Sequence, residues 1–237
     1  MIEKLRLDNV LFLDIETVPE LESFNLLDEE TQKLYDLKTQ YQRKDGETPE
    51  EFYERAGIWA EFGKIVCLSV GFFTFKSDIR HFRVTSFHGE EPKILRDFNN
   101  LLANHFNKPQ HILCGHNAKE FDFPYMARRM IIHGIALPPK LNLFGKKPWE
   151  VPHLDTMELW KFGDYKSFTS LKLLTKILGV PSPKGDIDGS QVAHVYYVEK
   201  DIDRIVTYCE KDVIAVAQVL LRFRQEDLLI DDEIIHV

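Results

Sequence analysis

Val10-Leu11-Phe12-Leu13-Asp14-Ile15-Glu16-Thr17 is the stretch from which the fold can be deduced. It has the apolar content of a buried strand, yet two acids interrupt it where that strand should continue. An unpaired carboxylate in such a run loses hydration and therefore requires a partner. Side chains i and i+2 of a strand share a face, so Asp14 and Glu16 should point the same way. The stretch predicts a strand over 10–17 with two carboxylates side by side.

Two like charges this close need a cation between them, or one of them must stay protonated. The alternative is a strand end with solvated acids, because the Asp-x-Glu pattern is common. It recurs in this chain at Asp28/Glu30, Asp45/Glu47 and Asp231/Glu233. Those three pairs lie in polar, acidic stretches, and only the first pair in the chain interrupts a strand. The pattern alone leaves a metal site and solvated acids equally open.

Composition indicates one globular domain over residues 1–237, because 44% apolar residues can bury a sizeable core. No segment approaches the apolar length of a membrane span, and the N-terminus lacks a signal-peptide core, so no membrane association is expected. Cys67, Cys114 and Cys209 are far apart and in apolar surroundings. This usage is typical of a reduced, cytoplasmic protein with buried thiols.

The charge is uneven along the chain. A formal net charge of −8 argues mildly against tight non-specific binding to a duplex, which needs many Lys and Arg contacts to phosphates. Residues 119–176, however, hold ten Lys/Arg against six Asp/Glu, so this segment is +4 and the remainder −12. It could face an anion, although a stretch of this charge is more often ordinary solvated surface.

Strand and helix signals alternate along the rest of the chain. Further strands are expected at 65–73, 79–87, 111–115 and 153–156, with a turn at 76–78. Helices are expected at 49–60, 91–106, 122–133, 168–178, 189–199 and 201–225, followed by an acidic tail. Residues 20–64 are polar and helix-prone, which predicts a helical insertion, and Thr48-Pro49-Glu50-Glu51 within it has the capping-box form. The order predicts an α/β fold with a mixed sheet flanked by helices.

Two further acids stand out in the predicted helices. Asp122 precedes a helix with Pro124 in its first turn, so taken alone it is best interpreted as an N-cap. Asp212 lies on the shoulder of the apolar stripe of helix 201–225, four residues after Tyr208, so these two side chains should lie on one line. Asp is rarely buried without a partner, and a half-buried pair with Lys or Arg is the alternative here.

The four acids could converge at one edge of the sheet, because Asp14, Glu16, Asp122 and Asp212 all lie at ends of elements. Four carboxylates with no His or Cys at ligand spacing favour a hard cation, Mg²⁺ or Mn²⁺. Two such ions about 4 Å apart would stabilise the attacking and leaving oxygens of an in-line phosphoryl transfer.

These residues resemble a known family. Asp14-x-Glu16, then Asn117-x-x-x-Phe121-Asp122, then Tyr208-x-x-x-Asp212 resemble the three motifs of the DEDD superfamily of 3′–5′ exonucleases. The tyrosine is that of the tyrosine subclass, since the histidine subclass would have His in place of Thr207. The residues that flank these motifs are most similar to those of stand-alone proteins related to the proofreading exonuclease domain of B-family DNA polymerases. The resemblance spans about residues 10–225.

The resemblance implies an RNase H-like fold with a mixed five-stranded sheet, and hydrolysis at a 3′ end with two divalent cations, Mg²⁺ or Mn²⁺. It implies that Asp14 bridges both metals and that Glu16 and Asp212 complete the first site. Asp122 would hold the second metal, largely through water. The family supplies no role for the insertion at 20–64.

The resemblance also implies a set of substrate contacts. Tyr208 would orient the attacking water or hydroxide, and Thr17, Asn117 and Phe121 would contact the terminal nucleotides. Phe121 has a rival interpretation as a hydrophobic staple on the first turn of its helix. The expected partner is the 3′ end of single-stranded nucleic acid, DNA in preference to RNA.

Other functions stay open at this point. A non-catalytic nucleic-acid-binding module of the same fold would tolerate loss of an acid, whereas all four acids are present. An RNase H-like endonuclease or integrase shares the acids, but the Tyr-x-x-x-Asp pair argues against it. An enzyme that trims RNA 3′ ends also fits, because no residue pattern here reads a 2′-hydroxyl.

Overall fold

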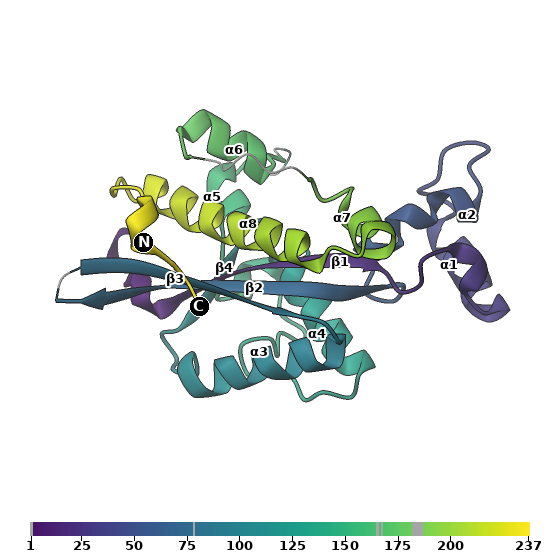
Figure 1. Cartoon of the computed structure of the whole chain (residues 1–237), viewed down its shortest axis with the longest axis horizontal. Helices are drawn as coiled ribbons and strands as arrows, with labels where there is room; N and C mark the ends of the chain where they lie inside the picture. The colour runs from purple at the N-terminus through teal and green to yellow at the C-terminus, as the bar shows by residue number, and fades with distance from the viewer. Residues whose placement is uncertain (1, 78, 165, 167, 182–186) are drawn as a thin grey trace.

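The computed structural model describes residues 2–77, 79–164, 166, 168–181 and 187–237, which form a six-stranded mixed sheet with helices on both faces (Figure 1). The strands are β1 (Val10–Pro19), β2 (Gly63–Lys76), β3 (Ile79–His88), β4 (Ile112–Gly115), β5 (Leu154–Asp155) and β6 (Ile234–His236). Their order across the sheet is β5-β4-β1-β2-β3-β6. The pairs β1–β2 and β2–β3 are antiparallel, and the pairs β1–β4, β4–β5 and β3–β6 are parallel.

The predicted α/β mixed sheet is confirmed, but the expected count of five strands is wrong. The end of the chain, expected as an acidic tail, turns back and pairs β6 with β3 through Phe82↔Ile234 to Val84↔His236. Three residues are too short for a periodicity signal, so their pairing depends on the exposed edge of β3. Residue 78 of the predicted turn at 76–78 lies outside the described residues.

Two layers of helices cover the sheet (Figure 1). The helices α3 (Glu91–His105) and α4 (Asp122–Ile132) cover one face, and the 22-residue α8 (Ile202–Phe223) crosses the other with α6 (Leu171–Leu178) packed on it. Short helices complete this second side: α5 (Thr156–Lys161), α7 (Val192–His194) and a π-helical turn (Val195–Glu199). None of these helices is long and apolar enough to cross a bilayer, as judged over the described residues.

The predictions for residues 189–199 and 153–156 need correction. The helix expected at 189–199 is α7 followed by the π-helical turn. The strand expected at 153–156 ends at Asp155, because that carboxylate caps α5 by accepting the backbone N–H groups of Met157 and Glu158. The helix α5 was not predicted from the sequence.

Strand β1 is buried on both faces, and its alternation separates the two cores. Leu11, Leu13 and Ile15 pack into the apolar cluster of α3 and α4. Phe12 packs into the cluster of α8. Since side chains two apart share a face of a strand, Asp14 follows Phe12 toward α8. The face that β1 turns to α8 is therefore apolar at Phe12, carries carboxylates at Asp14 and Glu16, and is apolar again at Val18.

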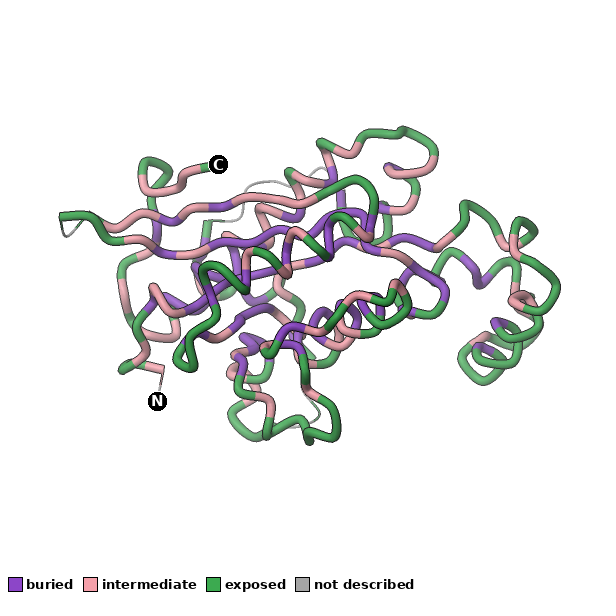
Figure 2. The backbone as a smooth tube through the Cα atoms, turned by 90° about the horizontal axis from the view of Figure 1, so that it is seen from below, coloured by how far each residue is buried: buried purple, intermediate pink, exposed green. Residues whose placement is uncertain are grey.

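The segment 20–64 extends beyond one end of the sheet (Figures 1 and 2). It contains a 3-10 turn (Phe24–Leu26), α1 (Glu29–Thr39), α2 (Pro49–Phe52) and a second 3-10 turn (Tyr53–Ile58). Its aromatic cluster is separate from the main cores and includes Tyr35, Phe52, Tyr53 and Phe62. That this segment is an insertion stays a prediction.

The helix expected at 49–60 has the predicted capping box, with Thr48 and Glu51 each accepting the other's backbone N–H. It ends early, however, at Phe52, and continues as a 3-10 turn. Gly57 in this turn lies so close to β1 that an added Cβ would be 2.9 Å from the carbonyl carbon of Val18. The missing Cβ of Gly57 thus permits a backbone-to-backbone approach that any other residue at this position would prevent.

Candidate active site

The carboxyl groups of Asp14 and Glu16 lie together on the part of β1 that faces α8. Their ligand oxygens and the Cys209 sulfur are all within 4.8 Å of one another. The two carboxyls are close enough for a hydrogen bond between them. Burial, reinforced by nearby carboxylates, raises the pKa of both well above the usual range. At least one of the pair therefore favours the protonated form when no cation is bound.

Asp122 is fixed by a hydrogen bond across the chain. Its Oδ1 accepts the backbone N–H of Ile15 at 3.1 Å. That N–H is accessible because β4 pairs with β1 only as far as Phe12. The N-cap interpretation of Asp122 is wrong: the helix begins at Asp122 itself, and the cap position is Phe121, without a side-chain cap. Burial raises the pKa of Asp122 to about 7, even though backbone N–H groups act to lower it.

Tyr208 and Asp212 lie one turn apart on α8 and are hydrogen bonded to each other. Burial raises the pKa of Asp212 to about 6, while the Tyr208 hydroxyl acts to lower it. Burial, then the charge of Asp212, raises the pKa of the Tyr208 phenol, so the phenol stays a hydrogen-bond donor. The alternative of an ion pair between Asp212 and a Lys or Arg is not found in the described part of the chain.

We call Asp14, Glu16, Asp122 and Asp212 the acid cluster. The charges of the other three members all act to raise the pKa of Asp14, which places the four carboxyls in one electrostatic group. Across the described residues, no Lys or Arg forms a salt bridge with any of the four. Carboxylate oxygens without an internal cation are the ligand chemistry that Mg²⁺ and Mn²⁺ prefer, and those of Asp14 and Glu16 lie within ligand distance of each other, so the residues present fit a divalent cation.

The loop between β4 and α4 is held in place by Asp155. One Asp155 oxygen accepts the backbone N–H of Asn117 and the other accepts that of Lys119, both at 3.0 Å. Asn117 has a positive φ of 61°, a backbone conformation that Asn tolerates better than most residues. Its side-chain oxygen is buried and has no hydrogen-bond partner. A buried acceptor left open beside the acid cluster is suited to receive a donor from a ligand.

Sequence reasoning missed two residues of this region, Asp155 and Cys209. Asp155 had a detectable signal, since Asp155-x-x-Glu158 has the spacing of a helix-start motif. Cys209 was expected only as a buried thiol, and all three cysteines are indeed buried and free. Its S–H also donates to the side chain and the carbonyl of Asp14, each at 3.4 Å. No local pattern could have predicted that contact, which joins β1 to α8.

The remaining predicted residues lie near the acid cluster in different settings. Phe121 is half-buried, directly before Asp122, with its ring centroid 5.3 Å from that of Tyr125. Thr17 follows a bulge in the β1–β2 pairing and contacts the hydroxyl of Tyr125. The structure thus brings the four acids and Tyr208 together, places Phe121 beside them, and directs Thr17 toward α4.

A cavity of about 310 Å³ opens between α6 and α8 beside this group. Tyr208, Lys211 and Asp212 line it from α8, and Lys172 and Thr175 line it from α6. It offers space next to two members of the predicted site, with two lysines on its walls.

Comparison with known proteins places this fold and site in context. A family model described as a predicted 3′-5′ exonuclease related to the exonuclease domain of PolB matches residues 58–234, about three quarters of the chain. The match begins after β1, so it does not include Asp14 and Glu16. No curated protein matches the chain.

A solved structure is similar to the chain in fold. The family B DNA polymerase from the hyperthermophilic archaeon Pyrobaculum calidifontis aligns with a TM-score of 0.54 and 18% sequence identity. The alignment covers 91% of this chain and 24% of the polymerase. The expected RNase H-like architecture is confirmed at the level of the fold.

Proposed function

The chain belongs to the family of predicted 3′-5′ exonucleases related to the exonuclease domain of PolB, and we propose that it hydrolyses single-stranded nucleic acid from the 3′ end with two divalent cations. The proposal rests on the acid cluster, in which Glu16 and Asp122 are buried and Asp14 and Asp212 are half-buried, with Tyr208 beside them and no neutralising cation among the described residues. An arrangement that is costly without a metal is suited to holding one.

Each acid has a proposed role in holding the cations. Asp14 would bind both, Glu16 and Asp212 would complete the first site, and Asp122 would hold the second, largely through water. When bound, the two ions would polarise the scissile phosphate and stabilise charge on the attacking and leaving oxygens. The N–H of Ile15 holds Asp122 in place for this role, and the thiol of Cys209 does the same for Asp14.

Tyr208 would orient the attacking water. Because its phenol remains protonated and donates to Asp212, its oxygen can accept a hydrogen bond from a water beside the acid cluster. In the proposed reaction the water oxygen bonds to phosphorus and the bond from phosphorus to the 3′ oxygen breaks. The strand then ends in a new 3′-hydroxyl, and a nucleoside 5′-monophosphate leaves.

The terminal nucleotides would contact the loop before α4. The open acceptor of Asn117 can receive a sugar hydroxyl or a base N–H, and the half-buried ring of Phe121 offers an apolar surface beside Asp122. We propose Thr17 as a third contact from β1. DNA is proposed over RNA because the family is related to the exonuclease domain of a DNA polymerase; the contacts themselves do not distinguish the two.

The test is purified protein with Mn²⁺ or Mg²⁺ on 5′-labelled single-stranded DNA and RNA, resolved on a sequencing gel. We expect a ladder that shortens from the 3′ end, with DNA degraded faster than RNA, and no ladder when EDTA replaces the metal. Asp14→Asn serves as the inactive control. Internal cuts would indicate an endonuclease, and strand binding without cleavage would indicate a non-catalytic module.

A further inference from the structure

Exposed aromatic side chains are concentrated in one part of the chain. Among the described residues, five aromatic side chains are at least 70% exposed: Tyr41, Phe144, Trp149, Phe162 and Phe168. Four of these five lie within residues 144–168, inside the segment 119–176 that carries a net charge of +4. Large exposed apolar groups that gather in one place usually mark an interaction surface.

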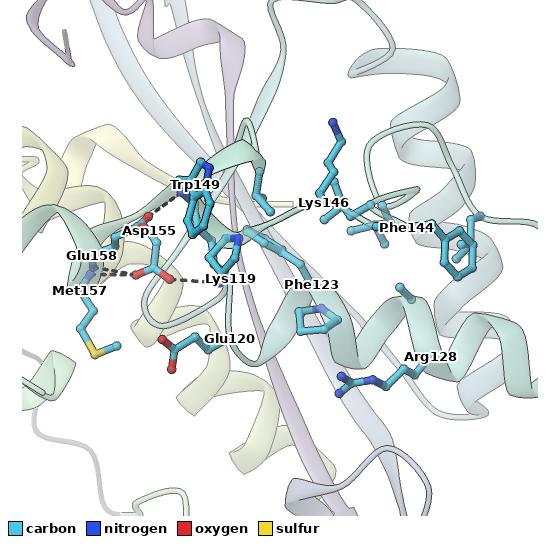
Figure 3. A pocket seen from close by; sticks show the side chains of 18 of the residues that line it. Lys119, Glu120, Phe123, Arg128, Phe144, Lys146, Trp149, Asp155, Met157 and Glu158 are labelled. Atoms are coloured by element: carbon cyan, nitrogen blue, oxygen red, sulfur yellow. Dashed lines mark hydrogen bonds and ion pairs between the residues drawn. The ribbon is translucent and has the colours of Figure 1, made fainter. Parts of the chain in front are cut away.

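Two of these rings border a cavity of about 810 Å³ between α4, α5 and the loop 137–151 (Figure 3). Phe144 and Trp149 line it from the loop, and Phe123 lines it from α4. Its wall includes Asp155 and Lys119, the two residues whose contact shapes the Asn117 loop. The cavity therefore opens beside the predicted site, at the loop proposed to contact the terminal nucleotides.

Its charges favour an anionic occupant. The carboxylate of Asp155 is committed to backbone N–H groups, Glu158 forms a salt bridge with Lys119 at 2.5 Å, and the exposed Glu120 lies 4.0 Å from Lys161. Arg128 and Lys146 line the cavity as exposed cations, and Lys147 lies over the Trp149 ring at 5.2 Å from its centroid. Aromatic rings interleaved with a few cations suit single-stranded nucleic acid, whereas a duplex needs many more phosphate contacts.

The loop is anchored, so its rings are presented in a defined place. Lys140 donates from its Nζ to the carbonyl of His111 at 2.5 Å, and its own carbonyl contacts the His153 ring at 2.7 Å. Near the tip, Glu150 accepts the N–H of Lys147 at 2.7 Å and closes a 3-10 turn around Trp149. An ordered platform loses less conformational entropy when a base stacks on it than a free loop would.

We propose that this surface, formed by Phe144, Trp149, Arg128, Lys146 and Lys147, binds the single strand on the 5′ side of the terminal nucleotides. This rests on the proposed exonuclease function, and it adds a second contact area outside the acid cluster. Bases stack on the two rings, and the three cations contact the phosphates between them. Long strands are then held at both places, whereas a dinucleotide reaches only the acid cluster.

Strand length separates the two proposals experimentally. Wild type, Trp149→Ala and Lys146→Glu are compared on a 5′-fluorescein dinucleotide and dodecanucleotide, each as DNA and as RNA. Binding is read by fluorescence anisotropy in EDTA, and hydrolysis is read with Mn²⁺. Tyr41→Ala is the matched control, because this ring is equally exposed but lies far along the chain, next to α1.

We expect Trp149→Ala to weaken binding of the dodecanucleotide and to raise its KM by about 10-fold, the effect of losing one stacked base. Lys146→Glu should weaken the same step more at low salt than at high salt. Dinucleotide hydrolysis should be unchanged in both, and Tyr41→Ala should match wild type throughout. If wild type cleaves the dinucleotide and both variants handle the long strand normally, the stacking surface is wrong. If wild type cleaves neither substrate, the exonuclease proposal itself fails.

Discussion

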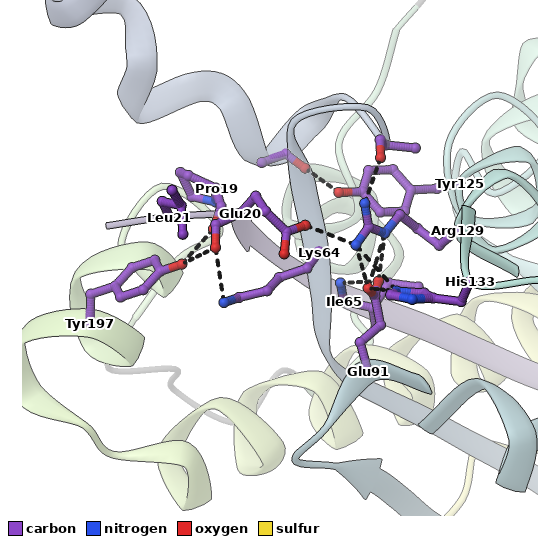
Figure 4. A network of polar contacts seen from close by, with 12 residues as sticks. Pro19, Glu20, Leu21, Lys64, Ile65, Glu91, Tyr125, Arg129, His133 and Tyr197 are labelled. Atoms are coloured by element: carbon purple, nitrogen blue, oxygen red, sulfur yellow. Dashed lines mark hydrogen bonds and ion pairs between the residues drawn. The ribbon is translucent and has the colours of Figure 1, made fainter. Parts of the chain in front are cut away.

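Two clusters of charged side chains, one along β1 and one just beyond its end, are built in opposite ways. The acid cluster gathers four carboxyls with no described cation among them. The second cluster, which we call the arginine network, consists of Glu20, Glu91, Arg129 and His133 (Figure 4). It also contains buried carboxylates, but a guanidinium lies at its centre.

The arginine network satisfies its charges internally. Arg129 is only 3% exposed. Its Nε contacts both oxygens of Glu91 at 2.9 and 3.0 Å, and its other nitrogens reach Glu20 and the carbonyl of Ala60 at 2.8 and 2.9 Å. Burial opposes the charge of Arg129, but the bonds to Glu91 outweigh it and raise its pKa. The network joins α3, α4 and the end of β1 without an external ligand.

The contrast distinguishes charges that stabilise the fold from charges that await a ligand. Buried ions are tolerated when well-placed partners and hydrogen bonds offset the free energy lost on desolvation, as around Arg129. The acid cluster has no such cationic partner among the described residues. The pKa of each of its members is raised instead, which favours the neutral, protonated form. Perturbed carboxyls in one group beside a cavity are typical of functional sites. The predictions below test this contrast.

The largest expected effect is on activity at the acid cluster. Asp14→Asn should reduce nuclease activity by about 1,000-fold or more, since it removes the carboxylate proposed to hold both cations. Stability in EDTA should equal or exceed that of wild type, because the change relieves repulsion. Gel assays and thermal melts measure the two effects. A variant that melted far below metal-free wild type and stayed active would contradict the metal site.

The second effect is on stability at the arginine network. Arg129→Met should lower the free energy of unfolding by about 3–5 kcal/mol, because Glu91 is left buried without its partner. Arg129→Lys is the control: it keeps the charge but loses the forked geometry, so its loss should be smaller. Urea denaturation measures both. If Arg129→Met lowered the free energy of unfolding by no more than about 0.5 kcal/mol, the network would contribute no more than an exposed salt bridge does.

A third comparison uses one tyrosine near each cluster. Tyr208→Phe should lower the rate by about 10- to 1,000-fold, the range for one positioning group, with little change in stability. Tyr197 donates its hydroxyl to the carbonyl of Pro19 at 2.6 Å, beside the arginine network. Tyr197→Phe should instead cost about 1 kcal/mol of stability and leave the rate near normal. Equal rates for the two variants would make Tyr208 only a packing residue.

The smallest effect is a pH dependence of stability without metal. The folded pKa values of Asp122, about 7, and Asp212, about 6, lie above the unfolded value of about 3.9. The folded state therefore binds more protons over this range, and the acid cluster loses stability as pH rises from about 4 to 7. Asp212→Asn removes one such group. Its stability relative to wild type in EDTA should rise by about 1–3 kcal/mol over that interval.

Glu233 provides the opposite control for this measurement. Its hydrogen bond to Arg80 lowers its pKa, so its stabilising contribution is present above the unfolded pKa and is lost at lower pH. Glu233→Gln should therefore lose stability relative to wild type as pH rises. If the stabilities of Asp212→Asn and Glu233→Gln relative to wild type changed with pH in the same direction, the carboxyls of the acid cluster would not repel one another as proposed.

The sequence predicted more of the elements than of their contacts. Strand β1, the long helix α8 and the capping box at Thr48 could be predicted because each depends on residues a few positions apart. Asp122 was misread as a cap for the same reason, since its local context was that of a helix start. The arginine network gave no signal, because Glu20, Glu91 and Arg129 are far apart in the chain.

By itself the sequence determined the α/β class, the buried course of β1 and the set of acids that the resemblance selected. Only the tertiary structure decided how those acids are held and what surrounds them. Asp122 reaches Ile15 because β4 stops pairing at Phe12, and Cys209 reaches Asp14 because α8 crosses that face of β1. The periodic patterns that predict helices and strands depend on residues a few positions apart in the sequence. Whether a buried charge is neutralised depends on partners brought together by the whole fold.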